Sequence, residues 1–288
     1  MRTALVFGAS GQIGVPLLRR LHAADWNVLA VSRQAHAHAP GVHWLRGELA
    51  GVDGLPDAVD AVFSCGPLDQ FARWHAATTL QAPRVVAFGS TSASTKQDSG
   101  DAGEHDLAHR LLDAETSLLS VAQARGVAVT VLRPTLVYGA GRDQTLTRIA
   151  GLSQRWGRFV LPRHANGLRQ PVHVDDLADA ALAACQSSTS HGRSYDLPGG
   201  ETLPYRDMVA RVLASLPTPS SLMELPMPLF RGALALAQWR GIAQEFTEHA
   251  LARMGQDLVF DSYPARRDFA YAPRKFKPDA SMFAVTRD

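Results

Sequence analysis

The sequence predicts an α/β fold, a doubly wound parallel sheet with a small, mainly helical C-terminal lobe. Short apolar and β-branched runs alternate with segments of helical length, which is typical of parallel strands joined by crossover helices. The first run ends in Gly8, Gly11 and Gly14, and an amphipathic stretch follows it. The length of 288 residues and the hydrophobic content of 46% allow one large domain and a smaller lobe.

Six of the runs predict buried strands, because they are nearly continuous in apolar character, as expected when helices cover both faces of a sheet. They are Ala4–Phe7, Asn27–Val31, Val42–Leu45, Ala61–Ser64, Arg84–Phe88 and Val127–Leu132. The polar stretch from Ser92 to Asp106 follows the fifth run and predicts a mobile loop. Ligands bind at the carboxyl ends of such strands, so we expect this loop to be either a lid or a plain connector.

The alternation fades after Gly139, which predicts two domains. The sheet domain is expected to comprise residues 1–140 and 171–200, and the substrate-binding lobe residues 141–170 and 201–288. The stretch from Pro171 to Cys185 predicts a short strand followed by a helix. Asp175 or Asp176 would cap that helix or complement its dipole in the first turn.

Charge and cysteine content narrow the classes of function. The 29 basic and 27 acidic residues leave a net charge of +2, so no strong field favours nucleic acid or a membrane surface. Cys65 and Cys185 are too few for a disulfide framework. Prolines and charged residues interrupt the apolar stretch 222–239, so no membrane span is expected. The first strand begins at Thr3 and leaves no room for a secretory signal, so we expect a cytoplasmic protein that acts on a small-molecule substrate.

The glycine-rich turn after the first strand predicts a Rossmann-type dinucleotide site. Gly8 permits a tight turn, Gly11 lets the backbone approach a pyrophosphate, and Gly14 lets the following helix pack closely on the strand. The pyrophosphate would then lie on N–H groups at a helix N-terminus. The cofactor-binding residues expected in this turn are Gly8, Ser10, Gly11, Gln12, Ile13 and Gly14.

The end of the second strand indicates which nicotinamide cofactor is used. Proteins that bind NAD place a carboxylate there to hold the ribose hydroxyls, whereas this chain has Ser32 followed by Arg33. A hydroxyl and a guanidinium can bind and neutralise a 2′-phosphate, which a carboxylate would repel. The pair therefore favours NADP, with NAD as the alternative if other groups decide the choice.

Five sequence patterns in order resemble the extended and atypical short-chain dehydrogenase/reductase group, the relatives of the NAD-dependent epimerase/dehydratase family. The patterns are GASGQIG at Gly8, GEL at Gly47, AVFSCGP at Ala61, VVAFGSTSA at Val85, and LRPTLVYG at Leu132 together with PVHVDDLADA at Pro171. The resemblance covers most of the chain and implies the same fold with a nicotinamide cofactor.

The resemblance also implies roles for residues at several strand ends. Glu48 and Leu49 would flank the adenine, and Ser90 and Pro134 would lie near the nicotinamide. The residues that would run beside the ribose are Ser64, Cys65 and Gly66. The HVDD element at His173 would be structural.

In this family a Ser or Thr, a Tyr and a Lys four residues after the Tyr form a proton relay. Thr91, or Ser90 beside it, matches the first member of the relay. With Glu115 at the usual acidic position of the catalytic helix, Leu107 and Leu111 stand where Tyr and Lys belong. No Tyr occurs between Met1 and Val137, so no small shift of register restores the pair.

Three explanations for this departure stay open. His105, His109 or Tyr138 could supply the proton, since the histidines lie a helical turn apart beside the loop and Tyr138 follows the sixth strand. Alternatively, the substrate needs no phenolate, as when hydride adds to an activated double bond. Lastly, the protein binds NADP(H) without turnover, as redox-sensing relatives in the atypical group do.

The expected function is therefore that of an NAD(P)-binding oxidoreductase or nucleotide-sugar epimerase-like protein with a small carbonyl or hydroxyl substrate. The alternative is a catalytically silent NADP(H)-binding sensor or partner-binding protein. No metal site is expected, because His36, His38 and His43 lack accompanying cysteines or spaced carboxylates and are interpreted as solvated loop residues. The resemblance is compatible with a monomer or a homodimer.

Overall fold

The computed structural model describes residues 2–37, 39–97, 99–218, 220–241 and 248–284. The chain divides into two compact units. The first unit comprises Met1–Thr135, Val174–Pro198 and Asp261–Pro273, and the second comprises Leu136–His173, Gly199–Phe260 and Arg274–Asp288.

The first unit is built on a mainly parallel sheet with the strand order β12-β7-β6-β5-β1-β2-β3-β4. All neighbouring pairs are parallel except β3 and β4, which form an antiparallel pair. The strands are β1 (Arg2–Phe7), β2 (Trp26–Ser32), β3 (Val42–Glu48), β4 (Gly51–Val52), β5 (Ala61–Ser64), β6 (Arg84–Phe88), β7 (Ala128–Pro134) and β12 (Arg193–Leu197). The predicted fold class and the six predicted strands are confirmed.

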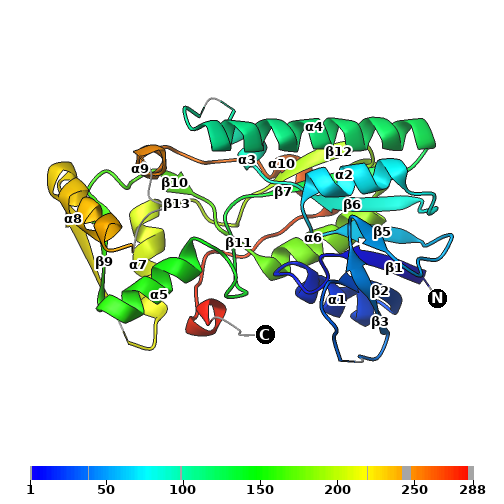
Figure 1. Cartoon of the computed structure of the whole chain (residues 1–288), viewed down its shortest axis with the longest axis horizontal. Helices are drawn as coiled ribbons and strands as arrows, with labels where there is room; N and C mark the ends of the chain where they lie inside the picture. The colour runs from blue at the N-terminus through cyan, green and yellow to red at the C-terminus, as the bar shows by residue number, and fades with distance from the viewer. Residues whose placement is uncertain (1, 38, 98, 219, 242–247, 285–288) are drawn as a thin grey trace. The chain divides into compact units, whose positions relative to one another are not determined.

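Helices cover both faces of this sheet, as the apolar strands require. Figure 1 shows α2 and α4 packed together on one face and α1 and α6 packed together on the other. The helices are α1 (Gly14–Ala23), α2 (Leu68–Ala77), α3 (Ser92–Thr95), α4 (Ala102–Arg125), α6 (Val174–Gln186), α10 (Tyr263–Phe269) and the 3₁₀ turn η1 (Ser188–Ser190). Beneath α2 and α4, the core is formed by buried side chains such as Phe7, Phe71 and Leu118.

Strand β12 extends the sheet beyond the six predicted strands. Its sequence is polar at Arg193, Ser194 and Asp196, so it lacks the apolar character by which the other strands are recognised. Tyr195 and Leu197 are the buried residues of the strand, which pairs with β7 at one end of the sheet. An edge strand with one partner tolerates this polar pattern better than a central strand does.

The described residues between Ser92 and Asp106 contain helix where the sequence predicts a loop. They include α3 and the start of α4, and the Asp101 carboxylate caps α4 by accepting a hydrogen bond of 3.0 Å from the Glu104 N–H. Glu104 in turn accepts a hydrogen bond of 2.8 Å from Ser99 Oγ and pairs with Lys96 Nζ at 3.2 Å. Local capping and ion pairing therefore order a segment that has few apolar side chains.

The second unit combines helices with short two-stranded sheets. Its described elements are β8 (Val137–Tyr138), α5 (Leu146–Trp156), β9 (Arg158–Pro162), β10 (Leu168–Arg169), β11 (Val172–His173), β13 (Leu203–Pro204), α7 (Tyr205–Ser215), β14 (Ser221–Leu225), α8 (Met227–Trp239), α9 (Glu248–Met254) and η2 (Ala280–Phe283). The strands pair as β8 with β11, β9 with β14 and β10 with β13. Within the described residues, no helix combines the length and the apolar character needed to span a bilayer.

The units differ from the predicted domains chiefly at residues 261–273. The sequence analysis assigns them to the lobe, but they belong to the first unit, where α10 packs against α6 and β12. The predicted strand and helix after Pro171 are present as β11 and α6, with Asp175 and Asp176 in the first turn of the helix.

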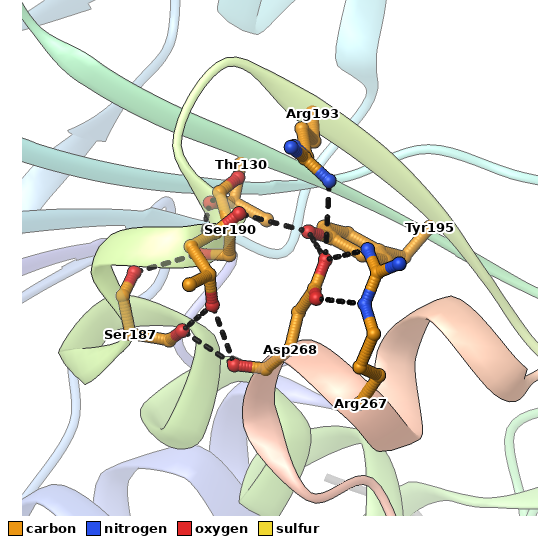
Figure 2. Close-up of polar contacts among 8 residues, drawn as sticks. Thr130, Ser187, Ser190, Arg193, Tyr195, Arg267 and Asp268 are labelled. Atoms are coloured by element: carbon orange, nitrogen blue, oxygen red, sulfur yellow. Dashed lines mark hydrogen bonds and ion pairs between the residues drawn. The ribbon is translucent and has the colours of Figure 1, made fainter.

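Asp268 anchors this returning segment on the first unit, as Figure 2 shows. Its carboxylate accepts hydrogen bonds of 2.7 Å from the Tyr195 hydroxyl and 2.6 Å from Arg267 Nε, and lies 3.4 Å from Arg193 Nη1. The backbone carbonyl of Asp268 accepts hydrogen bonds from the hydroxyls of Ser187 and Thr189. The hydrogen bond from Arg267, with that from Tyr195, lowers the pKa of Asp268 to about 2.

We expect Asp268→Asn to lower the melting temperature at neutral pH, because the amide keeps the size of the side chain and loses its charge. The folded-state pKa lies below the unfolded value, so the stabilisation is present above about pH 4 and is lost as the pH falls toward 2. Thermal melts between pH 7 and pH 2 should therefore show a shallower acid limb in the variant. Asp106→Asn, at an exposed ion pair of α4, is the control and should change little. An unchanged acid limb in Asp268→Asn would contradict the prediction.

Candidate functional site

The turns after β1 and β5 are in direct contact at the carboxyl edge of the sheet. Gly8 has a φ of +67°, a left-handed conformation that favours glycine. A Cβ atom at Gly8 would lie 2.9 Å from the carbonyl carbon of Cys65 and 3.0 Å from the nitrogen of Gly66. Cys65 also donates its N–H to the carbonyl of Phe7 at 2.9 Å. Gly8 is therefore needed both for the turn and for the approach of the neighbouring strand end.

Helix α1 begins at Gly14 and lies close against the same turn. A Cβ atom at Gly14 would lie 2.5 Å from the carbonyl oxygen of Ala9 and would also collide with that of Gly8. Gly11 donates its N–H to the Gly8 carbonyl at 2.9 Å, which closes the turn. The N-cap residue, Ile13, has no polar side chain to cap the helix. Val15 donates its N–H to the Gly11 carbonyl at 3.1 Å, and Pro16 has no N–H. Within the described first turn, the Gly14 N–H is thus the group left to bind an anion.

Two buried polar atoms beside this turn fit a bound dinucleotide. The side-chain oxygen of Gln12 and the hydroxyl oxygen of Ser64 are buried and have no hydrogen-bond partner within the described residues. Buried polar atoms in native proteins nearly always have a partner. Gln12 lies in the glycine turn and Ser64 at the end of β5. The Gln12 oxygen can accept a hydrogen bond from a ribose hydroxyl, and the Ser64 hydroxyl can donate to a phosphate oxygen, so both side chains and the glycine cradle fit a dinucleotide.

The end of β2 carries a polar cluster in contact with the glycine turn. Ser32 Oγ lies 3.3 Å from Ser10 Oγ, accepts a hydrogen bond of 3.2 Å from the Gln34 N–H, and lies 2.8 Å from His36 Nε2. The Arg33 side chain is exposed and makes no hydrogen bond or ion pair with the described residues.

His36 differs from the solvated loop residue that the sequence predicts. Its ring stacks on Trp44 of β3, with the ring centroids 4.0 Å apart and an angle of 24° between the planes. His43 is exposed, and His38 lies outside the described residues. Within the described residues, no group of three or more His, Cys, Asp or Glu side chains is arranged to hold a metal ion.

The residues expected near the adenine and the ribose meet at the same edge of the sheet. Leu49 Cδ1 would lie 3.5 Å from a Cβ atom on Gly66, so the turn after β3 reaches the turn after β5. Glu48 is exposed at the end of β3, and Ser64 is fully buried at the end of β5. Desolvation raises the pKa of the Cys65 thiol to about 12, which keeps it protonated at neutral pH.

The structure separates the roles of Ser90 and Thr91. Thr91 is 7% exposed and donates both its N–H and its hydroxyl to the carbonyl of Pro134, each at 3.2 Å. Ser90 is partly exposed, and its oxygen accepts the Ser92 N–H at 3.1 Å, which leaves its hydroxyl hydrogen available to a ligand. Thr91 therefore holds the ends of β6 and β7 together, and Ser90 is the better placed of the two to bind a substrate oxygen.

The other candidate proton donors are less favourably placed. Tyr138 belongs to the second unit, is 1% exposed, and contacts the rings of His173 and Phe276 edge-on in the core of that unit. His105 and His109 are exposed on α4, with their Nε2 atoms 3.1 Å apart. Helical spacing places them on the face of α4 opposite the one that buries Glu115 and Leu118 and carries Leu107 and Leu111.

A buried ion pair that the sequence analysis did not predict supports the strand ends under Ser90. Arg133, near the end of β7, donates to Glu115 of α4 through Nε at 2.9 Å and through Nη2. The Ser194 hydroxyl of β12 donates to the same carboxylate. Arg133 belongs to the LRP pattern that the sequence analysis noted. Its pairing with Glu115, however, could not be inferred from the sequence, because the two residues lie on different elements.

The sheet order and the glycine turn together define the first unit as a Rossmann-type α/β fold. A family model described as the NAD dependent epimerase/dehydratase family matches residues 74–197. The family resemblance indicated by the sequence patterns is thereby confirmed.

Individual proteins with related sequences and structures cover nearly the whole chain. It is 26% identical to the 2-alkyl-3-oxoalkanoate reductase of Stenotrophomonas maltophilia (strain K279a), with 94% of each chain covered. The crystal structure of UDP-glucuronic acid 4-epimerase from Bacillus cereus in complex with NAD is similar, with a TM-score of 0.73, 13% identity, and coverage of 98% of this chain and 96% of that one. The structure of MoeE5 in complex with UDP-glucuronic acid and NAD gives a TM-score of 0.71 at 18% identity, covering 98% and 97%. The two structural matches concern the fold.

We expect Gly14→Ala to destabilise the first unit by about 3 kcal/mol, because the added methyl group cannot avoid the carbonyls of Gly8 and Ala9. Urea denaturation measures the loss. Gly151→Ala in α5 is the matched control, since a Cβ atom there meets open space and should stabilise the helix by about 0.5–1 kcal/mol. Equal stability of the two variants would show that α1 does not need the close approach.

Proposed function

We propose that the protein is an NADP(H)-dependent oxidoreductase that acts on the carbonyl or hydroxyl group of a small molecule. The observation that carries the proposal is the junction of the glycine turn with the polar end of β2, where Ser10 meets Ser32 and Arg33 is exposed. A dinucleotide held on the turn would extend its adenosine toward this junction. The family match and the resemblance to a reductase support the same class of chemistry.

The chain's own residues would bind the cofactor at three places. The Gly14 N–H at the start of α1 would bind the pyrophosphate, and the unpartnered Ser64 hydroxyl would donate to a phosphate oxygen. The unpartnered Gln12 oxygen would accept a hydrogen bond from a ribose hydroxyl. The Arg33 guanidinium would pair with the 2′-phosphate. When bound, the nicotinamide would supply or accept the hydride.

Ser90 would orient the substrate by donating its hydroxyl to the reacting oxygen. The Ser92 N–H donates to the Ser90 oxygen and holds it in position. Thr91 and Arg133 hold the neighbouring strand ends through their bonds to the Pro134 carbonyl and to Glu115. The name of the Stenotrophomonas maltophilia relative, a reductase of a 3-oxo acid, supports a ketone substrate over a nucleotide sugar. Leu107 and Leu111 cannot donate a proton, so the proton would reach the product oxygen through Ser90 from solvent.

A second function, binding of NADP(H) without turnover, is favoured by a specific observation. The inward face of α4 carries Leu107 and Leu111 where the family has its Tyr and Lys, and the histidines of this helix lie on the outer face. In that function the protein would sense the ratio of reduced to oxidised cofactor or recruit a partner.

We expect Arg33→Ala to weaken NADPH binding about tenfold or more and to leave NADH binding within about twofold, because a charge-assisted hydrogen bond to phosphate contributes roughly 1.5–3 kcal/mol. Fluorescence titration of the reduced cofactors measures both constants. Arg19→Ala, which removes the same charge from the exposed side of α1, is the control. Equal losses for the two cofactors would refute the role in phosphate recognition.

We expect Ser90→Ala to lower kcat/KM for NADPH-dependent ketone reduction about 100-fold, with an unchanged Kd for NADPH, because the substrate oxygen loses its donor. Thr91→Val should lower the melting temperature and reduce kcat/KM less than Ser90→Ala does, because Thr91 bonds to the Pro134 carbonyl. The measurement uses a panel of small ketones and 3-oxo acids. Tight NADPH binding without turnover of any member would favour the sensor.

A further inference from the structure

We propose that His36 is a determinant of cofactor choice, acting as a second hydrogen-bond donor to the 2′-phosphate of NADP(H). This inference rests on the proposed function and adds a residue that the sequence analysis treated as part of a solvated loop. It depends on three observations at the ends of β2 and β3: how Ser32 is bonded, how the His36 ring is held, and which charges surround them.

The Ser32 hydroxyl already makes hydrogen bonds within the protein, so it is poorly suited to bind a phosphate itself. Its oxygen accepts the Gln34 N–H at 3.2 Å and lies within bonding distance of both His36 Nε2, at 2.8 Å, and Ser10 Oγ, at 3.3 Å. A hydroxyl has one hydrogen to donate, and two protein acceptors compete for it here. Ser32 is therefore a positioning residue, whose hydroxyl fixes one edge of the His36 ring.

The His36 ring is held in place before any ligand arrives. Stacking on Trp44 at 4.0 Å fixes the plane of the ring, and the contact from Nε2 to Ser32 fixes its rotation within that plane. Nδ1 then stays as the nitrogen without a partner in the described residues. A donor that is ordered in advance loses little conformational entropy when a ligand binds.

The protonation states of the ring suit an anion. When Ser32 donates to Nε2, the neutral ring carries its hydrogen on Nδ1, and in the cationic ring both nitrogens carry one. Both forms present an N–H at Nδ1, and a phosphate would select them over the remaining tautomer. Ser32, Arg33 and His36 contact no carboxylate of the described residues, and a carboxylate there would repel a 2′-phosphate.

Arg33 and His36 together would thus bracket the phosphate from the loop that follows β2. The Arg33 side chain is exposed and can move, whereas the His36 ring is held on Trp44, so the two donors differ in how strongly they are ordered before the ligand binds. The guanidinium contributes charge, and the imidazole contributes a directed hydrogen bond. This arrangement assigns specificity for NADP(H) to a pair of residues instead of to Arg33 alone.

The test compares His36→Phe with the wild-type protein by calorimetric titration of NADPH, NADH, adenosine 2′,5′-bisphosphate and AMP. Phenylalanine keeps the stack on Trp44 and loses the donor. We expect about tenfold weaker binding of NADPH and of the bisphosphate, with NADH and AMP unchanged within about twofold. His43→Ala, an exposed histidine on the neighbouring strand, should change neither.

Ser32→Ala separates a positioning role from a direct one. It should cause part of the NADPH-selective loss seen in His36→Phe and add little to it in the double variant, because both changes act through the same ring. Full additivity would show that Ser32 binds the phosphate itself and would overturn its positioning role.

Two results would overturn the role of His36 and leave the proposed function standing: unchanged NADPH affinity in His36→Phe, or equal losses for NADPH and NADH. Failure of the wild-type protein to bind any of the four probes would overturn both proposals. Thermal melts of each variant establish that the titrated protein is folded.

Discussion

The close contact of the turn after β1 with the turn after β5 and with the start of α1 is the constraint on which the first unit depends. Three backbone segments meet at Gly8 and Gly14 with no room for a side chain at either position. This contact sets the distance between β1 and its helix, and it joins the turn after β1 to the end of β5. The backbone geometry of the glycine turn, which suits a dinucleotide, is therefore set by steric contacts and does not depend on polar side chains.

Much of the fold could be predicted because its signals are local. The apolar runs that form β1, β2, β3, β5, β6 and β7, and the glycines that close the first turn, act within a few residues of where they stand in the sequence. The helix after Pro171 was equally visible, through the acids of its first turn. Strand β12 was not predicted, since Tyr195 and Leu197 are its buried residues and its other three residues, Arg193, Ser194 and Asp196, are polar.

The site was harder to predict where it depends on contacts between distant residues. Nothing in the spacing of His36 and Trp44 indicates that their rings stack, and the distinction between Ser90 and Thr91 comes from the Pro134 carbonyl, which lies 43 residues further on. The anchoring of Asp268 by Tyr195 likewise joins segments 73 residues apart. Such contacts depend on side-chain conformation and on the order of strands in the sheet. Both are properties of the folded chain, and local sequence patterns do not indicate them.

The return of residues 261–273 to the first unit gives each unit three separate segments of the chain. The chain passes between the units five times, after Thr135, His173, Pro198, Phe260 and Pro273. A truncation after any of the first four points would remove residues of both units, and one after Pro273 would remove residues of the second unit alone, so neither unit can be isolated by a single cut in the gene. Loss of residues from the carboxyl-terminal end as far as Asp268 would remove the carboxylate to which the Tyr195 hydroxyl donates at 2.7 Å, and part of α10, which packs on β12. Limited proteolysis near that end would therefore affect the unit that carries the glycine turn, although that turn lies more than 200 residues away in the sequence.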